Sequence, residues 1–173
     1  MSEHSDIGAL LAHVGPSLFQ QAYVVADRAA AEAAMEPLGV TRFVRLETGD
    51  LDYVVRGRTV SCALDLSFAR AGNVQIEIIQ PVRGEGLHVE FLEQHGSGPH
   101  HIGAIVDSLD ETLEIARAAG FEAAMRGDMG SVRFAYLDTF AVLGLYVETL
   151  EDPEGLIPML MPWRDDQPGA TRS

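Results

Sequence analysis

Residues 20–27 read Gln-Gln-Ala-Tyr-Val-Val-Ala-Asp, and residues 101–108 read His-Ile-Gly-Ala-Ile-Val-Asp-Ser. Each stretch is a short apolar run that opens with a polar side chain and closes with a residue suited to the N-cap of a helix. An alanine-rich segment follows the first stretch and residues 109–119 follow the second, and each ends at a glycine, Gly39 or Gly120. This pattern predicts a strand, a helix and a glycine stop that occur twice in the chain.

Further strands are expected after each helix. They cover residues 42–47, 61–69 and 73–80 in the first half, and residues 121–126, 131–137 and 141–150 in the second half. Each half therefore has the order of one strand, one helix and three strands. The sequence predicts an α+β protein of two βαβββ modules.

The repeats divide the chain into five parts. A glycine-rich stretch with a short helical pattern is the best candidate for a linker, and the apolar spacing near the start predicts a short amphipathic helix. The parts are the leader 1–18, the first module 19–81, the linker 82–99, the second module 100–152 and the C-terminal tail 153–173.

Composition excludes several classes of function. The 173 residues include 12 basic and 26 acidic side chains, for a net charge of −14, and every basic residue is arginine. Without lysine there is no Schiff-base chemistry, and the acidic balance argues against a nucleic-acid partner. The single Cys62 cannot form an internal disulfide, and no apolar run reaches the roughly 20 residues of a membrane helix. We therefore expect a cytoplasmic protein with no membrane partner.

Two carboxylates interrupt apolar strands at equivalent places, Glu77 in the last strand of the first module and Glu148 in the last strand of the second. One such residue alone would most simply face water on a one-sided sheet. The first strands, however, open with Gln20 and His101, and a pseudo-twofold axis would bring all four side chains together. This mixed oxygen and nitrogen set suits one divalent ion, with zinc, nickel, cobalt, manganese and iron(II) all compatible.

With these residues the sequence resembles the vicinal oxygen chelate superfamily, which includes glyoxalase I, methylmalonyl-CoA epimerase, extradiol dioxygenases and bleomycin-resistance proteins. The resemblance implies two βαβββ modules that form an open, barrel-like sheet around a divalent metal. It also implies that the metal ligands are Gln20, Glu77, His101 and Glu148. A single histidine at a ligand position argues against the dioxygenase branch, and Val24 stands where glutathione-dependent members usually have arginine.

The function implied is that of a metal-dependent lyase or isomerase, in which a polarised carbonyl makes the adjacent C–H acidic. Glu148 is the expected catalytic base, with Glu77 as ligand or second base. The substrate is an acyl-CoA thioester or an α-hydroxy or α-keto compound, and Arg56, Arg133 and Tyr136 are candidates to bind it. The alternative is a non-catalytic protein of the resistance type that sequesters a small molecule. A homodimer is also expected, since proteins of this fold often dimerise.

Two further histidines carry expectations of their own. Strand alternation lets only one of His100 and His101 point into the site, so His100 should lie on the outer face or support the site from behind. His88 falls in the linker, where a solvated surface histidine is the usual finding.

Overall fold

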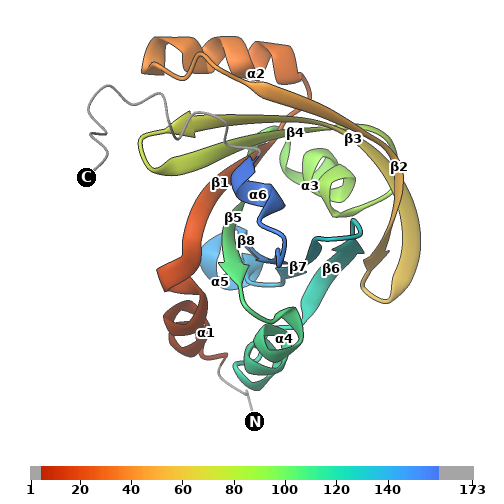
Figure 1. The fold of residues 1–173 in the computed structure, drawn as a ribbon. Coiled ribbons are helices and arrows are strands. Elements are labelled where there is room, and N and C mark those ends of the chain that lie inside the picture. Colours follow the sequence, from red (N-terminus) through yellow and green to blue (C-terminus); the bar gives the residue numbers. More distant parts are fainter. Residues whose placement is uncertain (1–4, 160–173) are drawn as a thin grey trace, which may run out of the picture.

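The computed structural model describes residues 5–159 of the chain. Eight strands form one closed ring, with some short helices outside it and others within its outline in Figure 1. The strands are β1 (Leu18–Val24), β2 (Val44–Val55), β3 (Arg58–Ala71), β4 (Val74–Gly84), β5 (Gly98–Val106), β6 (Ala123–Asp128), β7 (Arg133–Leu137) and β8 (Tyr146–Glu151). The α-helices are α1 (Ile7–Val14), α2 (Arg28–Met35), α3 (Leu87–His95), α4 (Leu109–Ala118), α5 (Phe140–Leu143) and α6 (Leu156–Met159).

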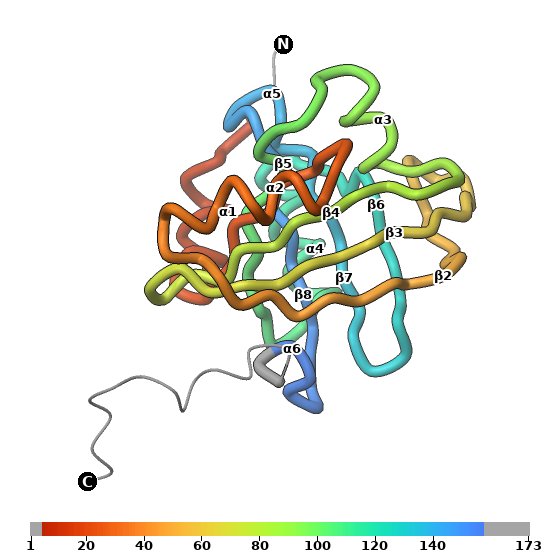
Figure 2. The backbone as a smooth tube through the Cα atoms, turned by 90° about the horizontal axis from the view of Figure 1, so that it is seen from above, coloured from red at the N-terminus to blue at the C-terminus, as the bar shows by residue number. Residues whose placement is uncertain are grey.

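The order of strands around the ring is β1-β4-β3-β2-β6-β7-β8-β5, so each half contributes four consecutive strands (Figure 2). Within both halves the first strand pairs in parallel with the last, β1 with β4 and β5 with β8. The halves meet where β1 pairs antiparallel with β5, and again where β2 pairs with β6. The predicted α+β fold class is confirmed.

Local sequence explains where the helices begin and end. The Asp27 side chain accepts a hydrogen bond from Ala30 N at the start of α2, and Ser108 does the same for Glu111 N at the start of α4. Gly39 and Gly120 have φ angles of 82° and 87°, the left-handed conformation that ends a helix at little cost in glycine. The caps and stops predicted from the sequence are therefore present.

Apolar side chains pack in two places. One cluster lies on the inside of the ring, and it includes Tyr53, Phe134 and Leu150. The other lies outside the second module, where Leu10 and Val14 of α1 pack with α4 and the outer face of β8. The helix predicted near the N-terminus thus exists and is held by burial of its apolar face.

Two features differ from the expectations, the start of the last strand and the closure of the sheet. Residues 141–150 were expected to be one strand, but Phe140–Leu143 form α5, which ends at Gly144 with a φ angle of 70°. The short helical pattern within the expected linker 82–99 forms α3, and the same stretch also contains the end of β4. The sheet also closes completely, through the pairing of Val54 and Val55 with β6 and a backbone hydrogen bond from Arg56 N to Ala124 O.

Most of the expected C-terminal tail, residues 160–173, lies outside the described residues, as do residues 1–4 of the leader. In the part of the chain that is described, no helix has both the length and the apolar character needed to cross a membrane.

Candidate functional site

The fold places Gln20, Glu77, His101 and Glu148 on four neighbouring strands of the ring. In the order β4, β1, β5 and β8, each of these strands contributes one of the four side chains. All four residues are buried, with exposed fractions of 7% or less. Because β1 and β5 pair at one junction and each has the last strand of its own module beside it, the internal symmetry brings the four residues together.

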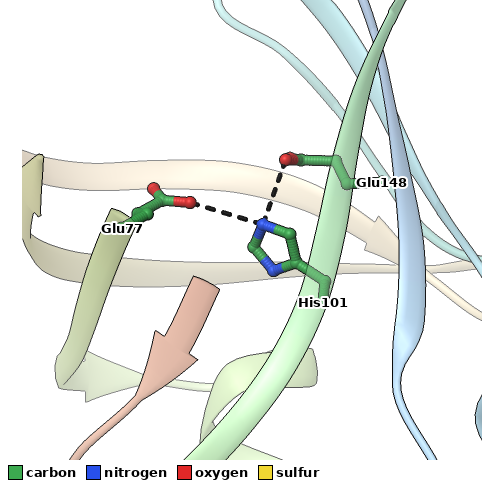
Figure 3. Close-up of side chains that lie close together, drawn as sticks. All are labelled: Glu77, His101 and Glu148. Carbon is green, nitrogen blue, oxygen red and sulfur yellow. Dashed lines mark ion pairs between the residues drawn. The ribbon is translucent and has the colours of Figure 1, made fainter. Parts of the chain in front are cut away.

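His101 Nε2 is the centre of the cluster. It lies 3.1 Å from Gln20 Oε1, 3.2 Å from Glu148 Oε2 and 3.3 Å from Glu77 Oε2. Figure 3 shows the carboxylates of Glu77 and Glu148 pointing toward the His101 ring from different strands. Glu77, His101 and Glu148 each offer one possible ligand atom, and these three atoms all lie within 4.8 Å of one another.

This geometry suits a small divalent cation. Metal–ligand bonds of about 2.1 Å put neighbouring donors about 3.0–3.4 Å apart in octahedral or tetrahedral coordination. The separations from His101 Nε2 to the three oxygens fall in that range. Two carboxylates and an imidazole are also donor groups that transition metals and zinc accept. The buried Glu77, His101 and Glu148 group could therefore hold a metal ion.

His100 supports the ring of His101 from behind. Its Nδ1 lies 3.0 Å from His101 Nδ1, and both residues are fully buried. Burial, together with the neighbouring His88 and His101, holds the pKa of His100 well below its usual value, so His100 is neutral. Because the neutral His100 accepts a hydrogen bond at its Nδ1, His101 carries a proton on its own Nδ1. His101 Nε2 therefore faces the cluster.

An irregularity in strand pairing explains why both histidines are inside. The register between β1 and β5 shifts from Ala22 opposite His101 to Tyr23 opposite Pro99. His100 falls at this shift and leaves the regular alternation of the strand. Of the two places expected for His100, the structure shows the one behind the site.

The electrostatics of the cluster favour retention of a proton. Burial lowers the pKa of His101, but the charges of Glu148 and Glu77 and their hydrogen bonds outweigh it and raise the pKa to about 9. Burial also raises the pKa of Glu77, against the pull of His101. Both shifts have one cause, since two carboxylates and one imidazole out of water are more stable with a proton between them. A divalent cation would offset the negative charge of the two carboxylates in the same way.

Gln75 is a part of the site that the sequence did not reveal. Gln20 Nε2 donates a hydrogen bond to Gln75 Oε1 at 2.7 Å, which turns Gln20 Oε1 toward His101. Gln75 lies two residues before Glu77 on the same face of β4 and is 1% exposed. The sequence does show that Gln75 is a second polar residue on the same strand face as Glu77. That pattern alone does not distinguish a buried amide from a solvated one.

Tyr136 and His88 form the next layer of the site. His88 Nε2 lies 3.3 Å from the Tyr136 hydroxyl. Burial, and after it the charges of Glu148 and Glu77, hold the pKa of Tyr136 well above its usual value. The surface position expected for His88 is wrong, because His88 is 2% exposed and burial lowers its pKa to about 3. Leu87 and Phe91 are four residues apart and lie on one buried face of α3. This apolar spacing is the feature of the sequence that predicts a buried face next to His88.

The structure does not bring Arg56 and Arg133 to the cluster. Arg56 forms a 2.5 Å ion pair with Glu90, and Arg133 forms a 2.7 Å ion pair with Asp110. Their side chains are 51% and 40% exposed. Of the three residues expected to bind substrate, only Tyr136 lies beside Glu148, since the two face each other on β7 and β8.

A cavity, partly open to solvent, begins at the cluster and extends inside the ring. Tyr136 and His88 line it together with Gln20, Gln75, Glu77 and Glu148. The remaining walls are mostly aliphatic and aromatic, and they are formed by Leu46, Thr48, Tyr53, Leu64, Leu66, Phe68, Ile79, Met129, Phe134, Leu150 and Ile157. A small molecule in this cavity would contact the carboxylates at one end and apolar side chains elsewhere.

Comparison with known proteins agrees with this architecture. A family model described as the glyoxalase/bleomycin resistance protein/dioxygenase superfamily matches residues 19–136. An uncharacterized protein, YqjC, from Bacillus subtilis (strain 168) is 35% identical over 51 residues. That match covers 30% of this chain and only 36% of the curated relative.

Solved structures share the fold at low sequence identity. The hypothetical protein BH1468 from Bacillus halodurans C-125 is 20% identical, with a TM-score of 0.57 over 79% of this chain and 94% of that chain. Methylmalonyl-CoA epimerase from Mycobacterium tuberculosis is 19% identical, with a TM-score of 0.53 over 84% of this chain and 93% of its own. A methylmalonyl-CoA epimerase variant from Streptomyces coelicolor, bound to 2-nitronate-propionyl-CoA, is 19% identical, with a TM-score of 0.54 over 80% of this chain and 95% of that chain.

Proposed function

Because this chain belongs to the glyoxalase/bleomycin resistance protein/dioxygenase superfamily, we propose that it is a metal-dependent lyase or isomerase acting on a carbonyl compound. The metal ligands in this proposal are Gln20, Glu77, His101 and Glu148. A divalent ion bound there would supply a Lewis acid for the carbonyl oxygen. The observation that carries the proposal is the meeting of two buried carboxylates at one imidazole nitrogen.

In the reaction, the Glu148 carboxylate takes the proton from the carbon beside the carbonyl, and the electron pair of that C–H bond moves toward the carbonyl oxygen. Return of a proton to the neighbouring carbon, or to the opposite face of the same carbon, gives the isomer. Glu77, on the other side of His101, is the second base if the proton returns to the opposite face. Tyr136 faces Glu148 across β7 and β8, and burial keeps its hydroxyl protonated and able to donate to an oxygen.

The neutral His100 has a positioning role. By accepting a hydrogen bond from His101 Nδ1–H, His100 fixes the orientation in which His101 Nε2 faces the carboxylates. Gln75 has the same role for Gln20, whose amide oxygen would otherwise be free to exchange places with its nitrogen. The site is therefore arranged before a substrate enters, which is what catalysis by fixed groups requires.

The proposal is tested by metal content and by proton exchange. Protein purified without a histidine tag should hold one divalent ion per chain, directly or after reconstitution with zinc, nickel, cobalt, manganese or iron(II). It should then exchange the α-proton of an α-hydroxy ketone or an acyl-CoA thioester with deuterium from solvent, followed by NMR.

Glu148→Gln should slow this exchange by at least about 100-fold, the usual scale of a lost general base. Glu122→Gln is the control, because Glu122 is 72% exposed, pairs with Arg117 and belongs neither to the cluster nor to the cavity lining. Metal content is measured for both variants, since Glu148 is also a proposed ligand. Full exchange by Glu148→Gln with bound metal would show that Glu148 is not the base.

The apolar cavity also favours a second function, sequestration of a small molecule without chemistry. This alternative predicts tight binding of an apolar compound by protein that binds no stoichiometric metal. The metal measurement separates the two functions, because a lyase or isomerase of the proposed kind loses activity when the ion is removed.

A cytoplasmic location and a homodimer belong to the proposal as well. The free Cys62 is buried, which is consistent with a reducing compartment. The homodimer is expected from the superfamily alone.

A further inference from the structure

The walls of the cavity give information about the substrate that the proposed function leaves open. We propose that the group entering the cavity is uncharged and apolar, an aryl or branched alkyl group on the reacting carbonyl compound, and that the Gln75 amide binds a second, uncharged oxygen of the same molecule. The inference rests on the proposed function for the position of the reacting carbonyl.

The first support is the chemistry of the wall. Leu64, Leu66 and Phe68 alternate along β3 and present three apolar side chains to the cavity. Phe134 and Leu150 face them from the second module. Burying an aryl or branched alkyl group against such a wall gains about 25 cal/mol per Å² of apolar surface, whereas a carboxylate there would lose its hydration without a partner.

The second support is the distribution of charge. Among the described residues that line the cavity there is no arginine, and the chain contains no lysine. Arginines of the described part of the chain are instead held in ion pairs with carboxylates, among them Arg28, Arg45, Arg56, Arg58, Arg83, Arg117 and Arg133. A substrate carboxylate inside the cavity would meet Glu77 and Glu148, and none of the described lining residues is an arginine that could balance it.

Occupation of the cluster by a divalent ion does not change this conclusion. Two carboxylates cancel the two positive charges of such an ion, while Gln20 and a neutral His101 add none. The loaded site is therefore close to neutral and has no excess positive charge with which to attract an anionic group.

The third support is a donor without an acceptor. Gln75 Oε1 is engaged by Gln20, but Gln75 Nε2 is buried and makes no hydrogen bond with the described residues. A buried amide N–H without a partner is costly because it has lost its bond to water, so such groups are rare in folded proteins. Gln75 lines the cavity two residues from Glu77, where its N–H can donate to an uncharged oxygen near the reacting carbonyl.

Binding of two matched probes tests the cavity. α-Hydroxyacetophenone is neutral, and its para-carboxylate has the same ring and the same two oxygens with one negative charge added. Isothermal titration with the full chain, as purified and after zinc loading, should show at least about tenfold tighter binding of the neutral probe.

A charge introduced at the cavity mouth should change this preference. Leu46 lines the cavity and is 43% exposed, so Leu46→Arg can be accommodated. It should improve binding of the para-carboxylate by about fivefold. Val74→Arg is the control, because Val74 is 41% exposed on the opposite face of β4 and should leave both affinities unchanged.

The Gln75 donor is tested with Gln75→Met, which keeps the length of the side chain and removes the amide. Binding of α-hydroxyacetophenone should weaken by about fivefold, while binding of acetophenone, which lacks the second oxygen, should change less than about twofold. Because loss of the Gln75 amide also frees Gln20, Gln20→Met is measured beside it. The difference in affinity between α-hydroxyacetophenone and acetophenone should be lost in the Gln75 variant and kept in the Gln20 variant.

Tighter binding of the para-carboxylate to the wild-type chain, or no measurable binding of either probe, would overturn the inference. So would an unchanged preference in Leu46→Arg. Preference for the neutral probe supports the inference whether or not its α-proton exchanges with solvent. Absence of exchange in metal-loaded protein counts against the proposed reaction alone, so the two failures are distinguishable.

Discussion

Gly103→Ala is expected to disturb the site through one added methyl group. Gly103 pairs with Gln20 across β5 and β1. A Cβ atom at position 103 would lie 2.5 Å from Gln20 Oε1 and 3.1 Å from Gln20 Cβ. The Gln20 amide can rotate away because it is the end of a flexible side chain. Its rotation breaks the 3.1 Å contact with His101 and the 2.7 Å hydrogen bond to Gln75.

The cost follows from these contacts. Two buried hydrogen bonds at about 1 kcal/mol each, with mild crowding at Gln20 Cβ, give a loss of stability of about 2–3 kcal/mol. In a chain of this size that lowers Tm by roughly 4–12 °C. If Gln20 is a ligand, zinc affinity should also fall by about 10–100-fold, the scale seen when a ligand loses its support.

Gly98→Ala is the matched control on the same strand. A Cβ atom there would have Phe91 Cζ at 3.9 Å as its nearest neighbour, an ordinary contact. Its stability should stay within about 0.5 kcal/mol of the wild type. Thermal unfolding by circular dichroism and zinc titration by calorimetry measure both effects. A Gly103→Ala protein with wild-type Tm and zinc affinity would refute the role given to Gln20.

The other predictions concern acid stability, the support of His101 and the thiol. Burial favours the neutral form of Glu32, but hydrogen bonds from Arg45, Ser67 and Arg28 outweigh it and lower its pKa to about 2. A depressed carboxyl pKa stabilises the fold above pH 4.5, and that stability is lost as pH falls toward 2. The shift corresponds to an upper limit of about 3 kcal/mol, reduced by screening of the exposed Arg45. Glu32→Gln should therefore unfold at a lower urea concentration at pH 7, and the difference from wild type should shrink at pH 3; an equal difference at both pH values would contradict this assignment. His100→Phe keeps a ring but removes the acceptor for His101 Nδ1, so zinc affinity should fall about 10–100-fold with little change in the far-UV spectrum; unaltered zinc affinity would mean that His100 only fills space. Burial raises the pKa of Cys62, so iodoacetamide should label native protein far more slowly than urea-unfolded protein; equal rates would show that the thiol is accessible.

The sequence predicts the repeated elements because their signals are local. The caps at Asp27 and Ser108 and the glycine stops act within a few residues of each helix. The position of α5 is harder to predict, since Phe140–Leu143 is an apolar segment that fits a strand equally well and only Gly144 marks its end. Ring closure depends on a short pairing between the end of β2 and β6, which no local pattern encodes.

Internal symmetry explains why four site residues could be named from the sequence. Gln20, Glu77, His101 and Glu148 occupy equivalent strand positions in the two modules, and equivalent positions meet at the axis that relates the modules. The position of an arginine side chain follows no such rule, because Arg56 and Arg133 pair with carboxylates of Glu90 and Asp110 on other elements. The burial of His88 is difficult to predict because glycines flank its segment, as they do in linkers. The segment is nevertheless a helix with a buried face.

Anomalous scattering from a crystal grown with cobalt or nickel tests the central claim most directly. The account predicts one peak at about 2.0–2.2 Å from His101 Nε2, with oxygen atoms of Glu77, Glu148 and Gln20 at similar distances. A data set with no peak there, in which His101 Nε2 still contacts both carboxylates, would contradict it.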